Sequence, residues 1–222
     1  MKLSNFSTTD ILNMTYEERL AVIVAMCTGI LDSGNYVAVD FETTGFSSDA
    51  SIMEAAFAVV GSHPMITQGE TTLYHKFFIP YVRVNPAALK VHGITRGVLA
   101  KKGATMWCDT DVETINELVG NRYIIQWGAG YDERVWKQTM IHLYGTCTGA
   151  ELEAEWFNIM YEFALLAAVP TKSGIKATTK LADAVRTAGL VFDSGEAHGA
   201  LYDAYAVVRL IEHYASLAPV DI

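Results

Sequence analysis

Two carboxylates, two residues apart, end the first strongly apolar stretch of the sequence. Asp40 and Glu42 follow YVAV and precede Thr43, Thr44 and Gly45. Residues two apart in a β-strand point to the same face, so this spacing would bring both carboxylates together. Like charges that close are costly unless a cation lies between them, and oxygen ligands suit Mg²⁺ or Mn²⁺. The pattern favours a divalent-metal site, with a solvated carboxylate pair on an edge strand as the alternative.

Two further segments carry ionisable groups where such a site could be completed. Asp132 follows the apolar stretch RYIIQW and the small residues 128–130, at the start of a predicted helix. Functional sites in α/β proteins gather at the C-terminal ends of strands, which is where Asp132 would lie. The alternative is that an acid in a first helical turn only interacts favourably with the helix dipole. His198 precedes the last predicted helix and Asp203 borders its apolar face, so both could reach the same site. The alternatives are a helix-capping role for His198 and a surface salt bridge from Asp203 to Arg209.

The elements that would position these residues follow a mixed α/β pattern. We predict strands at 36–41, 51–61, 71–80, 122–127 and 156–157, and helices at 15–31, 86–91, 109–119, 131–143, 159–167, 178–188 and 199–217. Thr15 and Glu18 have the spacing of a capping box at the start of the first helix. Three consecutive strands predict an antiparallel meander, and the later alternation of helix and strand indicates a mixed sheet flanked by helices.

Composition narrows the class of protein. The chain has 222 residues, of which 51% are hydrophobic, enough for one substantial core. It lacks an apolar stretch of membrane-spanning length and a signal-peptide pattern, so we expect a cytoplasmic protein with no membrane contact. Its three scattered cysteines indicate neither a disulfide framework nor a zinc cluster. A net charge of −9 argues against coating nucleic acid through many cationic contacts, but not against gripping a strand end through bound cations.

Four segments together resemble the DEDDh 3′–5′ exonucleases, which include polymerase proofreading subunits and oligoribonucleases. The segments are VAVDFETTG at 37–45, VHGIT at 91–95, WGAGYDERVW at 127–136 and AHGALYDA at 197–204. The resemblance implies an RNase H-like fold with a mixed five-stranded sheet over residues 35–222, preceded by a helical extension at 1–34. Two positions depart from the family pattern. Trp127 and Gly128 replace its usual His-Asn pair, and Asn158 stands where many members carry Asp.

The resemblance also implies a reaction, the removal of nucleotides from the 3′ end of single-stranded DNA or RNA with two Mg²⁺ or Mn²⁺ ions. The metal ligands would be Asp40, Glu42, Asp132 and Asp203. His198 would take a proton from the attacking water. The residues that would contact the terminal nucleotides are Phe41, Thr43, Thr44, Phe46 and His92. Ordinary core packing is the alternative for Phe46, and a loop histidine with satisfied hydrogen bonds is the alternative for His92.

Other functions stay open at this point. The sequence does not separate an RNA-trimming enzyme from a DNA proofreader, because no feature reports on a 2′-hydroxyl. A non-catalytic module that uses the exonuclease fold as a platform would usually have lost a ligand, and here the acidic set is complete. A phosphodiesterase acting on small nucleotides would need a closed pocket beside the metals. The N-terminal helix and the net acidity suggest a homodimer or docking to a polymerase or other replication partner.

Overall fold

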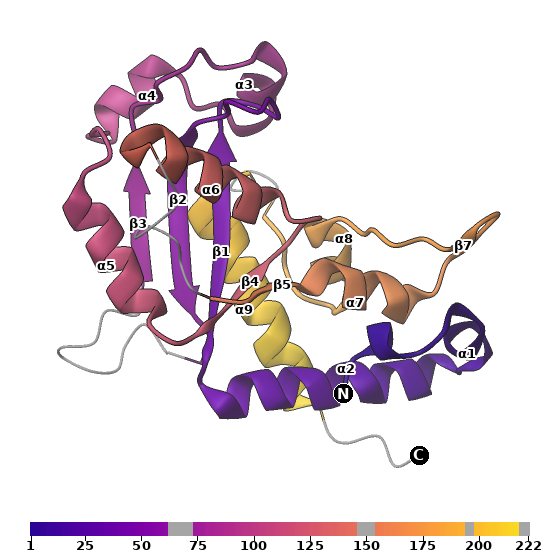
Figure 1. The fold of residues 1–222 in the computed structure, drawn as a ribbon. Helices are drawn as coiled ribbons and strands as arrows, with labels where there is room; N and C mark the ends of the chain where they lie inside the picture. The colour runs from indigo at the N-terminus through magenta and orange to yellow at the C-terminus, as the bar shows by residue number, and fades with distance from the viewer. Residues whose placement is uncertain (62–72, 146–153, 194–197, 218–222) are drawn as a thin grey trace.

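The computed structural model describes residues 1–61, 73–145, 154–193 and 198–217, which form an α/β structure (Figure 1). The strands are β1 (Tyr36–Thr43), β2 (Ile52–Val59), β3 (Leu73–Phe77), β4 (Tyr123–Gln126), β5 (Trp156–Asn158), β6 (Pro170–Thr171) and β7 (Gly174–Ile175). The helices are α1 (Thr8–Asn13), α2 (Tyr16–Ser33), α3 (Pro86–His92), α4 (Arg96–Lys101), α5 (Asp109–Val119), α6 (Tyr131–Tyr144), α7 (Ile159–Ala167), α8 (Leu181–Thr187) and α9 (Ala200–Ser216), with a short 3₁₀ helix, η1, at Leu3–Asn5.

Strand β1 is the middle strand of a mixed sheet. Within the described residues the sheet has five strands in the order β3-β2-β1-β4-β5. Strands β1, β2 and β3 pair antiparallel, which confirms the predicted meander, and β4 and β5 run parallel to β1. The predicted mixed five-stranded sheet flanked by helices is therefore confirmed. Because β1 is central, the alternative of a solvated carboxylate pair on an edge strand is wrong.

Helices cover both faces of this sheet, and the alternation along β1 decides which face the carboxylates share (Figure 1). Val37, Val39 and Phe41 point into the core beneath α5 and α6. Ala38 belongs to the core beneath α2, α7 and α9. Since side chains alternate along a strand, Asp40 and Glu42 lie on the α9 side with Ala38.

Small side chains bring the start of α9 close to the sheet. Ala56 lies opposite Asp40 in the β1–β2 pairing and packs against Ala200 and Ala204 of α9. All three alanines are fully buried. Alanine at these contacts allows close approach of the helix, which places Asp203, one residue before Ala204, beside the carboxylates of β1.

The N-terminal residues share the core of the α9 face. The capping box of Thr15 and Glu18 is present at the start of α2, as predicted. The buried side of α2, which includes Ile23, packs with α7 and α9 in one hydrophobic cluster. Before it, the Ser4 hydroxyl donates to the buried Glu162 carboxylate at 2.5 Å. The division of the chain at residue 34 stays a prediction, although α2 contributes to the same core as the sheet.

Some short elements differ from the sequence prediction. Helices α1 and α4 and the β6–β7 hairpin were not predicted, and α8 begins at Leu181 rather than at residue 178. Each of these elements is too short to show a clear periodicity. Their caps are the signal that remains, because Ser7 forms a capping box with Asp10 and Thr95 accepts from the Val98 backbone. The first two residues of the predicted strand at 71–80 lie outside the described residues.

Candidate active site

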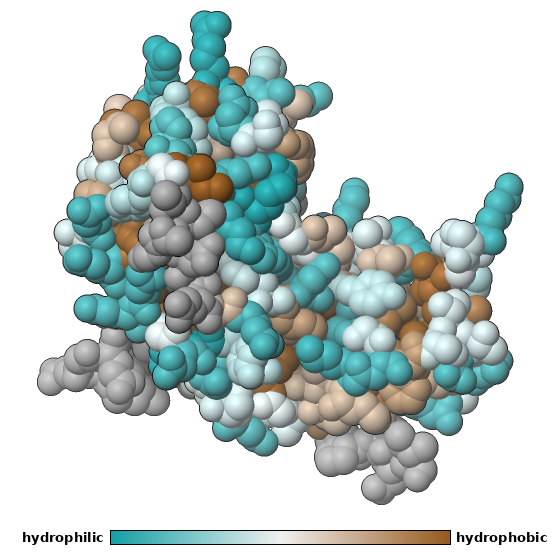
Figure 2. Space-filling model, viewed as in Figure 1, coloured by the Kyte–Doolittle hydropathy of each residue, from teal (hydrophilic) through white to brown (hydrophobic). Residues whose placement is uncertain are grey.

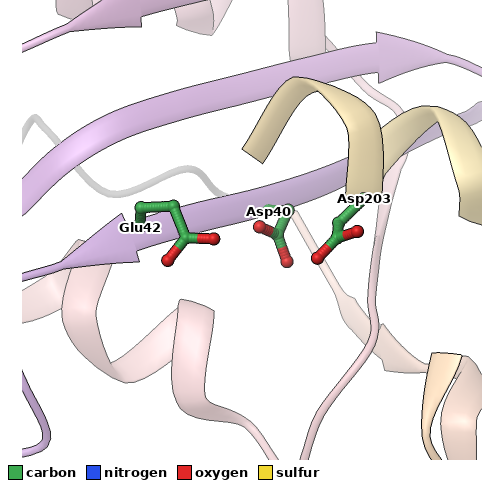
Figure 3. A group of neighbouring side chains, drawn as sticks. All are labelled: Asp40, Glu42 and Asp203. Atoms are coloured by element: carbon green, nitrogen blue, oxygen red, sulfur yellow. The ribbon is translucent and has the colours of Figure 1, made fainter. Parts of the chain in front are cut away.

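Three of the predicted metal ligands converge between β1 and α9. Asp40 and Glu42 point from the strand, and Asp203 points towards them from the helix (Figure 3). One carboxylate oxygen from each lies within 4.8 Å of the others, and all three side chains are half-buried. Strand alternation and the close approach of α9 thus assemble three oxygen donors from residues up to 163 positions apart in the chain.

Electrostatics show that this arrangement is unfavourable without a compensating positive charge. Burial raises the pKa of Asp40 well above its usual range, and repulsion from neighbouring carboxylates, Asp132 first, raises it further. Burial and then repulsion from Asp203 raise the pKa of Glu42 to about 9. The pKa of Asp203 rises to about 6 through burial, although the nearby His198 opposes that shift. Such carboxylates ionise together only when a cation shares the site.

Asp132 lies beside this group but outside the three-carboxylate cluster. It is buried in the first turn of α6, and burial raises its pKa to about 7 while hydrogen bonding to the Phe41 backbone lowers it. Its charge is the largest carboxylate contribution to the raised pKa of Asp40. The parallel pairing of β1 with β4 places it there, because α6 follows β4 directly. The structure therefore brings all four predicted ligands into one region, with Asp132 at its side.

Glu54 is a fifth carboxylate of this region, and the sequence analysis missed it. It lies directly opposite Glu42 in the β1–β2 pairing and is buried. Its carboxylate is 2.7 Å from the His75 Nε2 atom on β3. Its charge contributes to the raised pKa of Asp40, Glu42 and Asp203. The available signal was a single acid inside the otherwise apolar stretch of β2.

The donor set fits a divalent cation. Among the polar side-chain atoms that the structure describes, Asp203 Oδ1 is buried without a hydrogen-bond partner. A buried carboxylate oxygen without a partner costs free energy, and here it lies beside two more carboxylates. Asp203 also forms no ion pair with Arg209 within the described residues, so that alternative is wrong. Carboxylate-only donors are those that Mg²⁺ and Mn²⁺ prefer.

The family match agrees with this geometry. A family model described as an exonuclease, RNase_T, matches residues 37–211 of the chain. The chain belongs to this exonuclease family. The matched range holds Asp40, Glu42, Asp132, His198 and Asp203, and the match confirms the resemblance inferred from the sequence motifs. A comparison with curated protein sequences gives no significant match.

Solved structures of exonucleases share the fold of this family member. The structure of E. coli Exonuclease I in complex with a dT13 oligonucleotide matches with a TM-score of 0.62 and 15% identity, over 82% of this chain and 41% of that one. This chain therefore spans less than half of Exonuclease I. The nuclease domain of 3′hExo, a DEDDh family member bound to rAMP, matches with a TM-score of 0.60 and 15% identity, over 83% and 94% of the two chains. Exonuclease X with 5′ overhanging duplex DNA matches with a TM-score of 0.52 and 22% identity, over 80% and 90%.

The loop after β1 of the exonuclease domain is fixed to α6 by Tyr131. The Tyr131 hydroxyl donates to the Gly45 carbonyl at 2.7 Å and also contacts the Thr43 hydroxyl. The Phe46 and Tyr131 rings are in edge contact, with ring centroids 5.0 Å apart, and Phe46 is 82% exposed. Core packing, the alternative for Phe46, is therefore wrong. Tyr131, the residue that contacts Phe46, directly precedes Asp132 in the chain.

The other predicted substrate contacts are less open. The Phe41 side chain is buried on the opposite face of the sheet, so only its backbone can reach the site. Thr44 is buried, and its hydroxyl accepts from the Ser51 backbone at 2.9 Å. His92 has both ring nitrogens engaged, Nε2 with the Thr43 carbonyl at 3.1 Å and Nδ1 with the Ile94 N–H at 3.0 Å. His92 therefore has the geometry of a loop histidine with satisfied hydrogen bonds, which was the alternative to a substrate contact.

His198 lies near Asp203, just before α9. It is exposed, has a left-handed backbone with φ of 64°, and immediately precedes Gly199, which is the N-cap of α9. The helix-capping alternative for His198 is therefore wrong. Its proximity lowers the pKa of Asp203. A residue outside the first turn, with an uncommon backbone conformation, can place its imidazole beside Asp203 although the two are five residues apart.

The two departures from the family pattern serve the surrounding structure. Trp127 donates from Nε1 to the Thr179 carbonyl at 3.2 Å and stacks on Phe163. The Gly128 N–H donates to Asn158 Oδ1 at 3.4 Å. These residues thus hold the loop between β4 and α6 in place.

Over the ranges that the structure describes, no helix has the length and apolar character needed to cross a membrane.

Proposed function

We propose that this chain is a metal-dependent 3′–5′ exonuclease that removes nucleotides from the end of single-stranded DNA or RNA. The observation that supports it most is the convergence of the half-buried Asp40, Glu42 and Asp203, with an unpartnered oxygen on Asp203, in a chain of the exonuclease family. DNA is bound in the related Exonuclease I structure and a ribonucleotide in that of 3′hExo. A strand end is therefore the substrate that we propose here.

The carboxylates would hold two Mg²⁺ or Mn²⁺ ions. Asp40, Glu42 and Asp203 would share one ion, and Asp40 with Asp132 would hold the second. Divalent ions at this position neutralise the carboxylates and stabilise the negative charge that develops when a phosphodiester is hydrolysed. Without them the site repels phosphate, because five buried or half-buried acids surround it.

His198 would act as the general base. The residue is exposed, and its imidazole is close enough to affect the charge of Asp203. A neutral imidazole can accept a proton in general acid–base catalysis, so this ring can take the proton of the attacking water. The proton would pass from water to an imidazole nitrogen as the new oxygen–phosphorus bond forms and the bond from phosphorus to the 3′-oxygen of the preceding nucleotide breaks. That 3′-oxygen leaves as a hydroxyl after taking up a proton from solvent.

Phe46 would contact the terminal bases. Its ring is the most exposed aromatic side chain of the loop after β1, and Tyr131 supports it from beneath. A base can stack on such a ring whatever its identity, which suits an enzyme that must accept every nucleotide. The Thr43 carbonyl, which is bonded to His92, lies at the end of β1, just before this loop.

Release of mononucleotides from a single-stranded oligonucleotide tests this function. We expect hydrolysis of DNA or RNA in Mg²⁺ or Mn²⁺, none in EDTA, and a loss of about a hundred-fold or more in Asp203→Asn, because the ions supply several kcal/mol of stabilisation. Asp183→Asn is the matched control, since Asp183 is an exposed helical acid paired with Arg186. Equal rates in EDTA and in Mg²⁺, or an Asp203→Asn variant as active as Asp183→Asn, would show that the proposed site is not the active site.

A further inference from the structure

Positive charge is concentrated in one segment of this acidic chain. Residues 77–108 contain no Asp or Glu, whereas the whole chain has a net charge of −9. Of its 16 Lys and Arg residues, five lie in this segment, which leaves 11 against 25 acidic residues elsewhere. The five are Arg83, Lys90, Arg96, Lys101 and Lys102. We call the part of the structure formed by residues 77–108 the basic lobe.

The basic lobe stands at the end of the sheet towards which β1 runs. It consists mainly of α3, α4 and the chain that leads to them, and Figure 1 shows it beyond the tips of the strands. Hydrophilic side chains project from this end of the molecule in Figure 2. All five cationic side chains are exposed, and none of them forms an ion pair with another described residue. Their charge is therefore available to a ligand.

A groove runs through this lobe. It has a volume of about 720 Å³, within the usual range of ligand sites, and it opens to the surface. Its walls are mostly aliphatic, with Leu89, Ile94 and Leu99 among them. Arg83 and Arg96 are its charged lining residues, and no acidic residue of the described chain lines it. An apolar floor with two guanidinium groups matches the flat bases and the charged phosphates of a nucleic-acid strand.

The groove is continuous with the loop of the proposed active site. A second hollow, of about 630 Å³, shares Val82, Arg83 and Val84 with it. This second hollow extends to Thr44, two residues after the proposed metal ligand Glu42. The Asn85 N–H also donates to the Thr44 carbonyl at 2.8 Å, which fixes the two segments together. The second hollow, whose lining also includes Asp49, thus joins the groove to the segment that follows the proposed metal ligands.

We propose that the basic lobe binds the part of a single-stranded polynucleotide that lies upstream of its 3′ end. The bases lie against the aliphatic wall, and the phosphates are bound by Arg83 and Arg96. The orientation of the strand rests on the proposed exonuclease function, whereas the binding itself does not. An acidic partner protein is the competing occupant. The basic lobe would thus allow this acidic chain to bind a negatively charged strand although the rest of the chain is acidic.

Binding in EDTA tests the proposal without cleavage. The probes are 5′-fluorescein-labelled oligothymidylate and oligouridylate of about twelve nucleotides, and the measurement is fluorescence anisotropy over a series of KCl concentrations. In the double variant Arg83→Gln/Arg96→Gln we expect the Kd to rise about ten-fold at low salt. The salt dependence should weaken by about 0.7 for each lost phosphate contact, or about 1.4 in the log–log slope.

A second double variant separates a local contact from a change in net charge. Lys137→Gln/Arg186→Gln removes the same charge from side chains that pair with Glu133 and Asp183 outside the lobe. We expect its Kd to stay within two-fold of the wild type, a bound of about 0.4 kcal/mol in free energy. Equal weakening in both double variants, or no weakening in Arg83→Gln/Arg96→Gln, would overturn the proposal. A protein that binds through the lobe but never hydrolyses the strand would instead refute the exonuclease function alone.

Discussion

Glu54 tightens the carboxylate site from the strand next to β1. Glu54 lies directly opposite Glu42, and its carboxylate contacts His75, so the group of ionisable side chains extends across three strands. Groups of this kind orient metal ligands and adjust their basicity. The negative charge of Glu54 should therefore strengthen the attraction of the site for a cation, although Glu54 itself stands outside the three-carboxylate cluster.

We expect Glu54→Gln to weaken metal use without unfolding the chain. The amide keeps the shape and can still bond to His75, but it removes one charge. The Mn²⁺ concentration for half-maximal hydrolysis should rise about 10- to 100-fold, the usual effect of such a change. Glu117→Gln, an exposed acid on α5, is the control and should leave that concentration unchanged. A Glu54→Gln protein with wild-type Mn²⁺ dependence would mean that Glu54 only fills space.

Tyr131 is the second residue whose chemistry can be isolated by a small change. Tyr131→Phe keeps the ring beneath Phe46 but loses the bond to the Gly45 carbonyl. We expect the free energy of unfolding to fall by about 1 kcal/mol and the KM for single strands to rise several-fold, because the loop after β1 loosens. Tyr161→Phe, at an exposed position of α7, should change neither quantity. Unchanged KM in Tyr131→Phe would argue against a positioned loop.

The sequence was enough to predict which carboxylates come together, because strand alternation and the order of the motifs can be read directly from it. Asp40, Glu42 and Asp203 were predicted and do converge. Two residues were misjudged, the first by overlooking this alternation and the second for a tertiary reason. Phe41 was grouped with the substrate contacts, although the same alternation that unites Asp40 and Glu42 turns its side chain into the core. Glu54 was missed because its meaning depends on the register of β2 against β1, which one strand cannot reveal.

At the scale of elements, α2 is the least expected contributor to the domain. The family match begins at residue 37, yet α2 makes extensive contacts with α9, the helix that carries Asp203. Its capping box was readable from the sequence, whereas its partner was not, since an amphipathic pattern does not state which helix it covers. Element length decided which helices could be predicted from the sequence. Helices such as α5 and α6 have clear periodicity, but α1 and α4 have only six residues each.

Truncating one buried side chain of α2 should therefore destabilise the whole domain. Ile23 is fully buried in the cluster that joins α2, α7 and α9. We expect Ile23→Ala to lower the free energy of unfolding by about 2–5 kcal/mol, measured by urea denaturation. Ile141→Ala on α6, where the side chain is largely exposed, should cost about 0.5 kcal/mol or less. Similar small losses in both variants would indicate that α2 is a loosely attached extension.

At the scale of the molecule, the buried acids link stability to pH. Burial raises the pKa of Glu42 to about 9, of Asp132 to about 7 and of Asp203 to about 6. The unfolded chain releases these protons near pH 4, so their contribution to stability is complete below about pH 4 and is lost as pH rises through the folded values. The metal-free chain should thus become less stable between about pH 5 and pH 9.

Thermal unfolding in EDTA and in Mg²⁺ or Mn²⁺ measures this effect. We expect the Tm in EDTA to fall as pH rises over that range and the divalent ions to restore it, most strongly at the alkaline end. Asp203→Asn should reduce both the fall and the restoration, because it removes one titrating ligand. A Tm in EDTA that rises with pH, or that does not respond to the ions, would contradict a buried cation site.

The direction of digestion tests the central claim most directly. Two copies of one single-stranded oligonucleotide, labelled at the 5′ or at the 3′ end, are incubated with the chain and Mg²⁺ or Mn²⁺. A 3′–5′ exonuclease shortens the 5′-labelled strand in steps of one nucleotide and releases the 3′ label at once as a mononucleotide. Internal fragments from the 3′-labelled strand, or stepwise shortening of that strand from its 5′ end, would contradict the assignment.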